Sequence, residues 1–524
     1  AFTALACALV LAGCAGDGPP TEEPAGDAAQ APFDAVEATI GEIQGALRSG
    51  ATTCRGVVGA YLARIEHYDA STGLGAITEV NPRALERADD VDRALAAGED
   101  LGPLFCAPIL VKDNFDTHDL PTTGGSAALR GSVPPDDAFM VARLREAGAI
   151  VLAKTNMAEW AFSPRQTISS SYGRTANAYD LGRVPAGSSG GTASGVAASF
   201  GVAGLGTDTG NSIRGPSSHA ALFGIRSTLG LTSRDGVIPL IFDRDVAGPM
   251  ARTVEDGVRL FDVIAGHDPN DALSVPGRRE ASYLDRLRVD GLEGARVGVL
   301  RAHADLEASD PAVLALFEAA LADLERAGAT LVDPVAIPNW QTHRTAELSC
   351  PTFRYDAARY LESLGDGAPI GDIKEAYDAG DFDPHARDGL EFFLGFPGDV
   401  PQGEWEEPCP PFLEHPGRRA FLDDVQRAMD EAGVTALVFP TWAYPPAPID
   451  RGREEYRGDN SQLVAPSTGV PAVTVPMGFV DGLPAGLQIL GRRFDDGVLI
   501  QYAYAYEQLT RHRRAPSAFP ALDP

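Results

Sequence analysis

Lysine is almost absent from this chain of 524 residues. It occurs only at Lys112, Lys154 and Lys374, and every other basic residue is an arginine. An arginine side chain keeps its proton in a protein, whereas a buried lysine can lose it. Lys112 directly follows the apolar stretch Cys106–Val111, so we expect it to be buried and to act as a base. Lys154 is predicted to have a structural role.

Positive charge, long apolar runs and clusters of metal ligands are also lacking. The formal net charge is −30, which makes nucleic acids and anionic lipid surfaces poor partners. No apolar run reaches the roughly 20 residues that span a bilayer. There is no Cys-x-x-Cys and there are no histidines at ligand spacing, so we expect neither a metal nor a cofactor. What is present, 44% hydrophobic and 22% charged residues, suits a large folded core.

The first 32 residues have the composition of a targeting segment. Residues 1–13 are predicted to be a lipoprotein signal peptide, clipped at its start, because they are mostly small or apolar and Leu11-Ala12-Gly13-Cys14 resembles a bacterial lipobox. Residues 14–32 are rich in glycine, proline, alanine and acids, which is typical of a flexible tether. These features predict an exported lipoprotein of the cell envelope, attached to the membrane only through Cys14. An ordinary buried helix is the alternative.

Four further cysteines are available for disulfides in such an oxidising compartment. They are Cys54, Cys106, Cys350 and Cys409. Four cysteines allow three pairings, of which we favour Cys54 with Cys106 and Cys350 with Cys409.

The hydrophobic pattern alternates between helices and short buried strands. Residues 34–68 predict two amphipathic helices. Strands are predicted at residues 106–111, 149–153, 201–206, 434–439, 471–476 and 486–490, and helices at 138–147, 190–200 and 502–510. A further α/β stretch is predicted from 296 to 336, whereas residues 337–433 are less regular. This alternation favours an α/β fold with a largely parallel sheet.

Two glycine-rich segments carry serines that could react. Gly187-Ser188-Ser189-Gly190-Gly191 precedes Gly206-Thr207-Asp208-Thr209-Gly210-Asn211-Ser212. A serine needs a base to become a nucleophile, and nothing nearby resembles a Ser-His-Asp arrangement, whereas serine–lysine pairs are a known alternative. To act near neutral pH, the pKa of Lys112 must fall by about 3 units from ~10.4. Lys112 need not contact Ser212 directly, and Ser188 lies between them in the sequence.

These segments, with Lys112-Asp113-Asn114, resemble the signature of the amidase signature family. Other matching stretches are Gly124-Gly125-Ser126, Lys154-Thr155-Asn156-Met157-Ala158-Glu159 and Thr468-Gly469-Val470-Pro471. The resemblance implies an α/β fold with a central mixed, largely parallel twisted sheet covered by helices on both faces. It also implies one domain over residues 33–524, within which residues 337–433 form a variable cap of helices and loops.

The resemblance also assigns roles to the residues of the two segments. Ser212 would be the nucleophile, Ser188 would follow a cis peptide and relay the proton to Lys112, and Ser189 would give that lysine a second hydrogen bond. The backbone N–H groups of Thr209, Gly210, Asn211 and Ser212 would form the oxyanion hole. Asp208 and Arg214 are expected to support the loop as a buried pair.

Two residues depart from the family pattern. Asn211 and Ala186 stand where glycine is usual. Asparagine tolerates left-handed backbone better than most residues, so we expect Asn211 to alter specificity rather than chemistry.

Two other interpretations of the glycine-rich segments are weaker. Gly187-x-Ser189-x-Gly191 also matches a nucleophile elbow, which requires a strand directly before it, but residues 180–185 are polar and end in proline. A phosphate-binding loop would need Gly-x-x-x-x-Gly-Lys-[Ser/Thr], which is missing from the sequence.

The sequence thus predicts a hydrolase of small aryl or alkyl amides that forms an acyl-enzyme on Ser212, and that also cleaves esters or carbamates. Its partner would be a small-molecule substrate, with no nucleic acid. The alternatives are the amidase subunit of a tRNA-dependent amidotransferase, a urethanase-like carbamate or ester hydrolase, and an envelope binding protein without turnover.

Overall fold

The computed structural model of the protein describes Ala1 and residues 33–304 and 309–523. Cys14, nearly all of the expected signal peptide and the expected tether lie outside these residues, so the expectations about them stay predictions. Within the described ranges, no helix is both long and apolar enough to cross a membrane.

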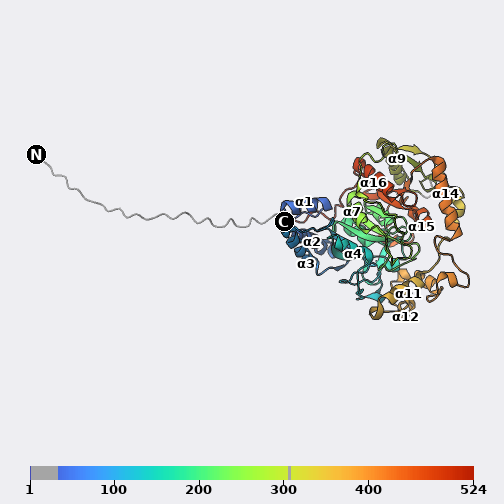
Figure 1. The fold of residues 1–524 in the computed structure, drawn as a ribbon, viewed down its shortest axis with the longest axis horizontal. Coiled ribbons are helices and arrows are strands. Elements are labelled where there is room, and N and C mark those ends of the chain that lie inside the picture. Colours follow the sequence, from blue (N-terminus) through green and yellow to red (C-terminus); the bar gives the residue numbers. More distant parts are fainter. Residues whose placement is uncertain (2–32, 305–308, 524) are drawn as a thin grey trace.

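An 11-stranded sheet passes through the middle of the molecule (Figure 1). Its strands, in spatial order, are β1 (Ile77–Val80), β3 (Ile150–Thr155), β2 (Pro108–Lys112), β6 (Ala203–Asp208), β8 (Val246–Ala251), β7 (Phe223–Arg226), β12 (Ala472–Val480), β13 (Leu483–Leu490), β11 (Ala436–Pro440), β9 (Arg296–Val299) and β10 (Thr330–Val332). The sheet is mixed, as predicted. Its parallel neighbours form two groups, β3–β2–β6 and β11–β9–β10, and the strands between and beside these groups pair antiparallel.

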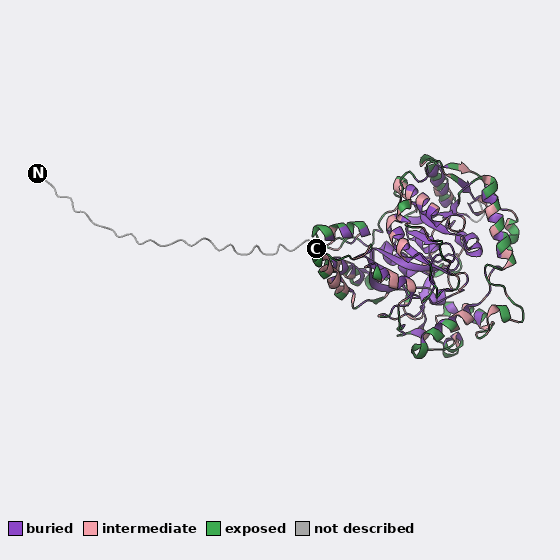
Figure 2. Ribbon diagram, viewed as in Figure 1, coloured by how far each residue is buried: buried purple, intermediate pink, exposed green. Residues whose placement is uncertain are grey.

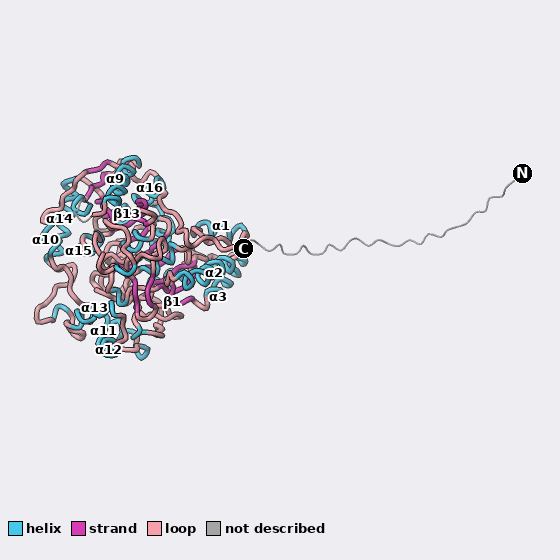
Figure 3. Tube along the Cα trace, turned by 180° about the vertical axis from the view of Figure 1, so that it is seen from behind, coloured by secondary structure: helices cyan, strands magenta, loops and turns pink. Residues whose placement is uncertain are grey.

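Sixteen helices are described around this sheet. They are α1 (Ile40–Ser49), α2 (Cys54–Thr72), α3 (Ala84–Ala97), α4 (Phe139–Glu146), α5 (Gly190–Ala197), α6 (Arg214–His219), α7 (Val254–Ile264), α8 (Arg301–Ala304), α9 (Pro311–Arg326), α10 (Trp340–Thr345), α11 (Phe353–Ser363), α12 (Ile373–Ala379), α13 (Arg387–Leu394), α14 (Pro416–Ala432), α15 (Val464–Thr468) and α16 (Asp496–Thr510). Figure 2 shows the strands buried at the centre and the exposed faces of the helices around them. Figures 1 and 3 place the C-terminus beside α1 and α2, where Arg64 of α2 donates to the Phe519 and Pro520 carbonyls.

The helix that follows the first serine segment packs unusually close to the sheet. α5 consists of small residues and is buried throughout. A Cβ added at Gly191 would lie 2.2 Å from the Asn156 carbonyl oxygen, which is far inside van der Waals contact. Glycine is therefore required there, and the close approach holds the start of α5 against the end of β3.

The region 337–433 divides into two parts. α11, α12 and α13 form a separate apolar cluster with Trp160, Ile238 and Leu129 of the main body, and Figure 3 shows these helices together at one end of the molecule. α14 instead packs its buried residues, among them Phe421 and Val425, with β11 residues such as Leu437. The expectation that residues 337–433 form a cap stays a prediction. α14 lies in the layer over the sheet, because its apolar face is buried there.

Both favoured disulfides are confirmed. Cys54 is bonded to Cys106, and Cys350 is bonded to Cys409. The second disulfide spans 59 residues of sequence and closes the segment that carries α11 to α13.

Replacing Cys350 and Cys409 together by serine should lower the free energy of unfolding by about 2–4 kcal/mol, because the unfolded chain regains the freedom of that loop. Urea denaturation of the double variant measures the loss. A denaturation midpoint unchanged from the parent protein would show that this loop is already constrained without the bond.

Candidate active site

Lys112 is fully buried at the carboxyl end of β2, as predicted. Its Nζ lies 2.7 Å from Ser188 Oγ and 2.6 Å from Thr207 Oγ1. Burial lowers the pKa of Lys112 to about 7, against the opposing charges of Asp245 and Asp208. A large part of this lysine is therefore neutral at neutral pH, and a neutral amine can accept a proton from a hydroxyl.

The serine loop joins Lys112 through one of its two serines only. The Gly187–Ser188 peptide bond is cis, and Ser188 Oγ contacts the lysine. Ser189 does not give Lys112 a second hydrogen bond, contrary to the expectation. Its hydroxyl donates to the Thr207 carbonyl (3.2 Å) and accepts from the Thr207 N–H (3.3 Å). Thr207 takes its place because β2 and β6 are parallel neighbours, which brings the Thr207 side chain beside Lys112.

Ser212 lies in the loop between β6 and α6, where the sequence placed it. Its Oγ donates to Asn211 Oδ1 at 3.3 Å, and Asn211 Nδ2 donates to the Pro164 carbonyl at 3.2 Å. Among the described residues no hydrogen bond joins Ser212 to Ser188, so this link of the relay stays a proposal. Asn211 has no positive φ, so the left-handed backbone considered for it is not needed. A side chain is compatible with this backbone, because its φ is outside the left-handed region.

Four consecutive backbone donors are unused in this loop. The N–H groups of residues 209, 210, 211 and 212 have no acceptor in the described part of the chain, although these residues are buried. Buried N–H groups without a partner are rare in native proteins. The arrangement suits donation to an oxygen that becomes negative. A Cβ added at Gly210 would lie 2.0 Å from Gln462 Oε1, so a larger residue there would displace the end of the Gln462 side chain.

A buried ionic cluster holds the base of the loop. Asp208 contacts the Arg214 guanidinium at 3.1 Å, as expected, and also Arg226 at 3.1 Å. Burial opposes the charge on Asp208, but the two guanidiniums lower the pKa of its carboxyl to about 2. Asp208 also accepts from the N–H of Ile213. These charge-assisted bonds fix the turn that presents Ser212.

Several residues of the site were not predicted from the sequence. They are Thr207, Arg226, Asp245, Gln462 and Gln488, of which Gln488 accepts a hydrogen bond from Arg214. Thr207 had a usable signal, since it lies inside the motif near the end of a strand. Lys154, by contrast, has the structural role expected: its Nζ donates to the Phe115 carbonyl, Thr117 and Thr122.

The second departure from the family pattern has a structural consequence. Ala186 has φ 64°, in the left-handed region that favours glycine. The Thr167 hydroxyl donates to its carbonyl at 2.9 Å and helps to hold it there. Ala186→Gly should therefore raise the free energy of unfolding by about 1 kcal/mol in chemical denaturation. A loss of stability would show that the alanine methyl contributes more through packing than it costs in backbone strain.

One group of residues could hold a metal ion within the described ranges: His118, Asp119 and Asp137. The Arg145 guanidinium already contacts both carboxylates, at 2.5 and 3.1 Å, and offsets part of their charge. The expectation that no cofactor is needed stays a prediction.

No strand directly precedes Ser189, since the preceding strand, β5 (Gly173–Thr175), ends far upstream. This excludes the nucleophile elbow.

A family model described as Amidase matches residues 56–500. The chain belongs to this family. The resemblance to amidase signature enzymes is thereby confirmed, and members of the family hydrolyse carbon–nitrogen bonds.

Relatives within the family differ in what their names say. The chain is 36% identical to a glutamyl-tRNA(Gln) amidotransferase subunit of Symbiobacterium thermophilum, over 87% of this chain and 93% of that protein. It is 35% identical to the peptide amidase of Stenotrophomonas maltophilia, with a TM-score of 0.81 over 92% of this chain and 98% of the other. The crystal structure of the corresponding amidotransferase subunit from Thermotoga maritima is 28% identical, with a TM-score of 0.69 over 91% and 95%.

Proposed function

We propose that this protein hydrolyses small linear amides through an acyl-enzyme on Ser212. The observation that carries the proposal is the buried Lys112, whose pKa is about 7 and whose Nζ is hydrogen-bonded to Ser188. The Ser212 loop, which has four unused backbone N–H donors, belongs to the same site. The likeness to peptide amidase over nearly the whole chain supports an amide as the substrate. Esters and carbamates would be cleaved as well, because they pass through the same anionic intermediate.

The proposed steps follow from these contacts. The Ser212 hydroxyl turns from Asn211 towards Ser188 and attacks the amide carbon; its proton passes to Ser188, and the Ser188 proton passes to Lys112. The carbonyl oxygen becomes negative and accepts from the N–H groups of residues 209–212. When the carbon–nitrogen bond breaks, the leaving amine takes the proton back from Lys112 through Ser188. Water then attacks the acyl-enzyme ester on Ser212 and passes its proton along the same route. The carboxylic acid leaves, and the Ser212 hydroxyl is restored.

The pH dependence of the reaction tests the base directly. Only the neutral amine of Lys112 accepts a proton, so kcat/KM should fall about tenfold for each pH unit below 7 and level off above it. Asp245 raises the pKa of Lys112 through its charge, so Asp245→Asn should move this limb to lower pH. The exposed Asp450→Asn is the control and should leave it in place. If the pH at which kcat/KM begins to fall is the same in Asp245→Asn as in the parent protein, the titrating group is not Lys112.

A second candidate is the amidase subunit of a tRNA-dependent amidotransferase. The names of the curated relatives favour it, and they describe those proteins as subunits of an enzyme of glutamyl-tRNA. The exclusion of nucleic acid therefore stays a prediction for this chain. Two disulfides and a net charge of −30 support the hydrolase instead, because disulfides are rare in the cytosol and the charge repels RNA. Glutaminase activity that rises when partner subunits are added would establish the second candidate.

The location outside the cytoplasm is also a proposal. The two disulfides support an oxidising compartment. Mass spectrometry of the protein from its native cells should find diacylglycerol on Cys14. An unmodified N-terminus upstream of Cys14 would refute the lipid anchor.

A further inference from the structure

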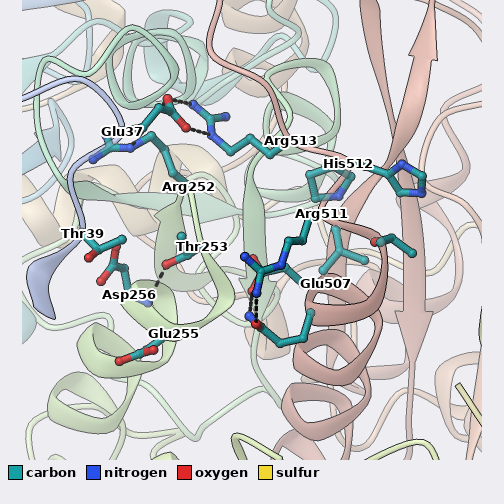
Figure 4. Close-up of a pocket in the computed structure, with 14 residues that line it drawn as sticks. Glu37, Thr39, Arg252, Thr253, Glu255, Asp256, Glu507, Arg511, His512 and Arg513 are labelled. Carbon is teal, nitrogen blue, oxygen red and sulfur yellow. Dashed lines mark hydrogen bonds and ion pairs between the residues drawn. The ribbon is translucent and has the colours of Figure 1, made fainter. Parts of the chain in front are cut away.

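A cavity of about 320 Å³ lies beyond the ends of the central strands that are farthest from Ser212. Figure 4 shows the residues that line it. β8 runs antiparallel to β6, with Val246 opposite Asp208 and Ala251 opposite Ala203. Arg252, which lines the cavity, directly follows Ala251. A strand rises about 3.3 Å per residue, so the two ends of β6 lie about 17 Å apart. The cavity is therefore distinct from the site of amide hydrolysis.

Four parts of the chain meet around this cavity. The lining comes from the segment before α1 (Glu37, Thr39), the start of α7 (Arg252, Thr253, Glu255, Asp256), β12 (Val475, Pro476) and the end of α16 with the residues after it (Glu507, Gln508, Thr510, Arg511, His512, Arg513). Figure 4 shows Thr253 and Asp256 on one side of the cavity and Glu507 and Arg511 on the other.

Most of the charges in the lining already have partners. Glu37 receives two hydrogen bonds of 2.7 Å from Arg513, and its Oε1 lies 4.0 Å from Arg252 Nε. Glu255 pairs with Arg259 at 2.6 Å. Glu37 and Glu255 therefore have guanidinium partners, while Arg511 of the lining donates to the neutral Gln508 amide oxygen.

Asp256 and Glu507 are the two carboxylates of the described lining without a guanidinium partner. Asp256 is 1% exposed; its Oδ1 accepts from the Ile40 N–H, and its Oδ2 has no hydrogen-bond partner. Glu507 accepts from the Val254 N–H at 2.7 Å and from the neutral Gln508 amide at 3.2 Å. Neither carboxylate has an ion-pair partner within 4.0 Å among the described residues. Asp256 is a buried carboxylate without a cation, which is costly, and Glu507 is half-buried. Desolvation raises the pKa of Asp256 to about 6 and that of Glu507 to about 7.

We propose that this cavity binds a small organic cation with a primary ammonium group. The ammonium would donate to Asp256 Oδ2, to Glu507 and to the hydroxyl of Thr39 or Thr253, which matches its three donors. A short alkyl chain would lie against Val475 and Pro476. A metal ion fits less well, because the described lining residues offer no three carboxylate or histidine ligand atoms within 4.8 Å of one another.

The pH dependence of binding has a definite sign. The ammonium requires ionised carboxylates, so affinity should increase as pH rises through the pKa values of Asp256 and Glu507, about 6 and 7. The other charged groups that face them are Glu37, Arg252, Glu255, Arg511, His512 and Arg513.

Isothermal titration calorimetry of the full chain with butylammonium chloride tests the proposal. We expect saturable binding with one site, binding at least about tenfold weaker for the isosteric Glu507→Gln, and affinity within about twofold of the parent for the matched control Glu255→Gln. Butylammonium is also of the class of product that amide hydrolysis releases, so binding at the active site must be distinguished from binding in the cavity. Ser212→Ala makes this distinction: it should bind butylammonium as tightly as the parent protein, whether or not the protein hydrolyses amides.

Three results would overturn the proposal. Butanol or butyrate binding as tightly as butylammonium would show that the positive charge is not recognised. An affinity unaffected by Glu507→Gln would place the ligand elsewhere, and a loss of binding in Ser212→Ala would place it in the active site. If Glu507→Gln does not fold, the pH series on the parent protein decides, and an affinity that is constant between pH 5.5 and 8 counts against the cavity.

Discussion

Replacing Ser212 by alanine should reduce kcat/KM for amides by about 10⁴-fold or more, while the thermal unfolding of the protein changes little. The serine oxygen forms the bond to the acyl group, so no other group in the loop can substitute for it. The unused N–H donors of residues 209–212 remain, so substrate binding and a small residual rate over water should persist. Initial rates and a melting curve on the same preparation measure both.

Ser189→Ala is the matched control for this variant. Ser189 lies in the neighbouring glycine-rich loop but bonds the Thr207 backbone rather than Lys112, so we expect a loss of about tenfold or less. A Ser212→Ala enzyme that keeps more than a few per cent of the activity would place the nucleophile elsewhere. A larger loss for Ser189→Ala than for Ser212→Ala would exchange the two roles.

Lys112→Ala should reduce amide hydrolysis by about 10³–10⁴-fold and hydrolysis of an activated ester clearly less. General acid–base catalysis contributes about 10²–10⁴ to such reactions. An amine must gain a proton to leave, whereas a phenolate leaves without one. The comparison of an anilide with the phenyl ester of the same acid, over a range of pH, therefore isolates the proton that Lys112 supplies.

Lys112→Met keeps the volume of the buried side chain and separates chemistry from packing. Lys112 makes two short contacts, with Ser188 and Thr207, and has no exposed surface. We expect Lys112→Met to unfold close to the parent protein and to be as inactive as Lys112→Ala on amides. Equal losses on the anilide and the ester would contradict proton transfer to the leaving group.

The strands next to the site were predictable, whereas β7 and β8 in the middle of the sheet were not. β2 and β3 are short apolar runs bounded by turn residues, and such runs indicate buried strands. β8 contains Gly248 and Pro249, which are rare inside a central strand. β7 has only four residues. Pairing with neighbours that are distant in sequence holds both in place, so no local pattern reveals them.

In the candidate site, residues within local motifs were predictable, whereas residues that the tertiary fold brings in from distant segments were not. Lys112, Ser188 and Ser212 were predicted because each lies in a motif at the end of a strand or in a glycine-rich loop. Gln462 approaches Gly210 from a segment 252 positions later in the chain. Arg226 reaches Asp208 from β7, a strand that was itself not predicted. Contacts of this kind depend on the tertiary fold, so periodicity and motif spacing carry no information about them.

The most direct test of the account is to locate the acyl group on the protein. The parent protein should be treated with a fluorophosphonate or a slowly hydrolysed activated ester, and the modified peptide should then be identified by mass spectrometry. We expect a single adduct on Ser212, formed much more slowly in Lys112→Ala and missing in Ser212→Ala. An adduct on Ser188 or Ser189, or equal labelling of the Lys112→Ala variant, would contradict a nucleophile activated by the buried lysine.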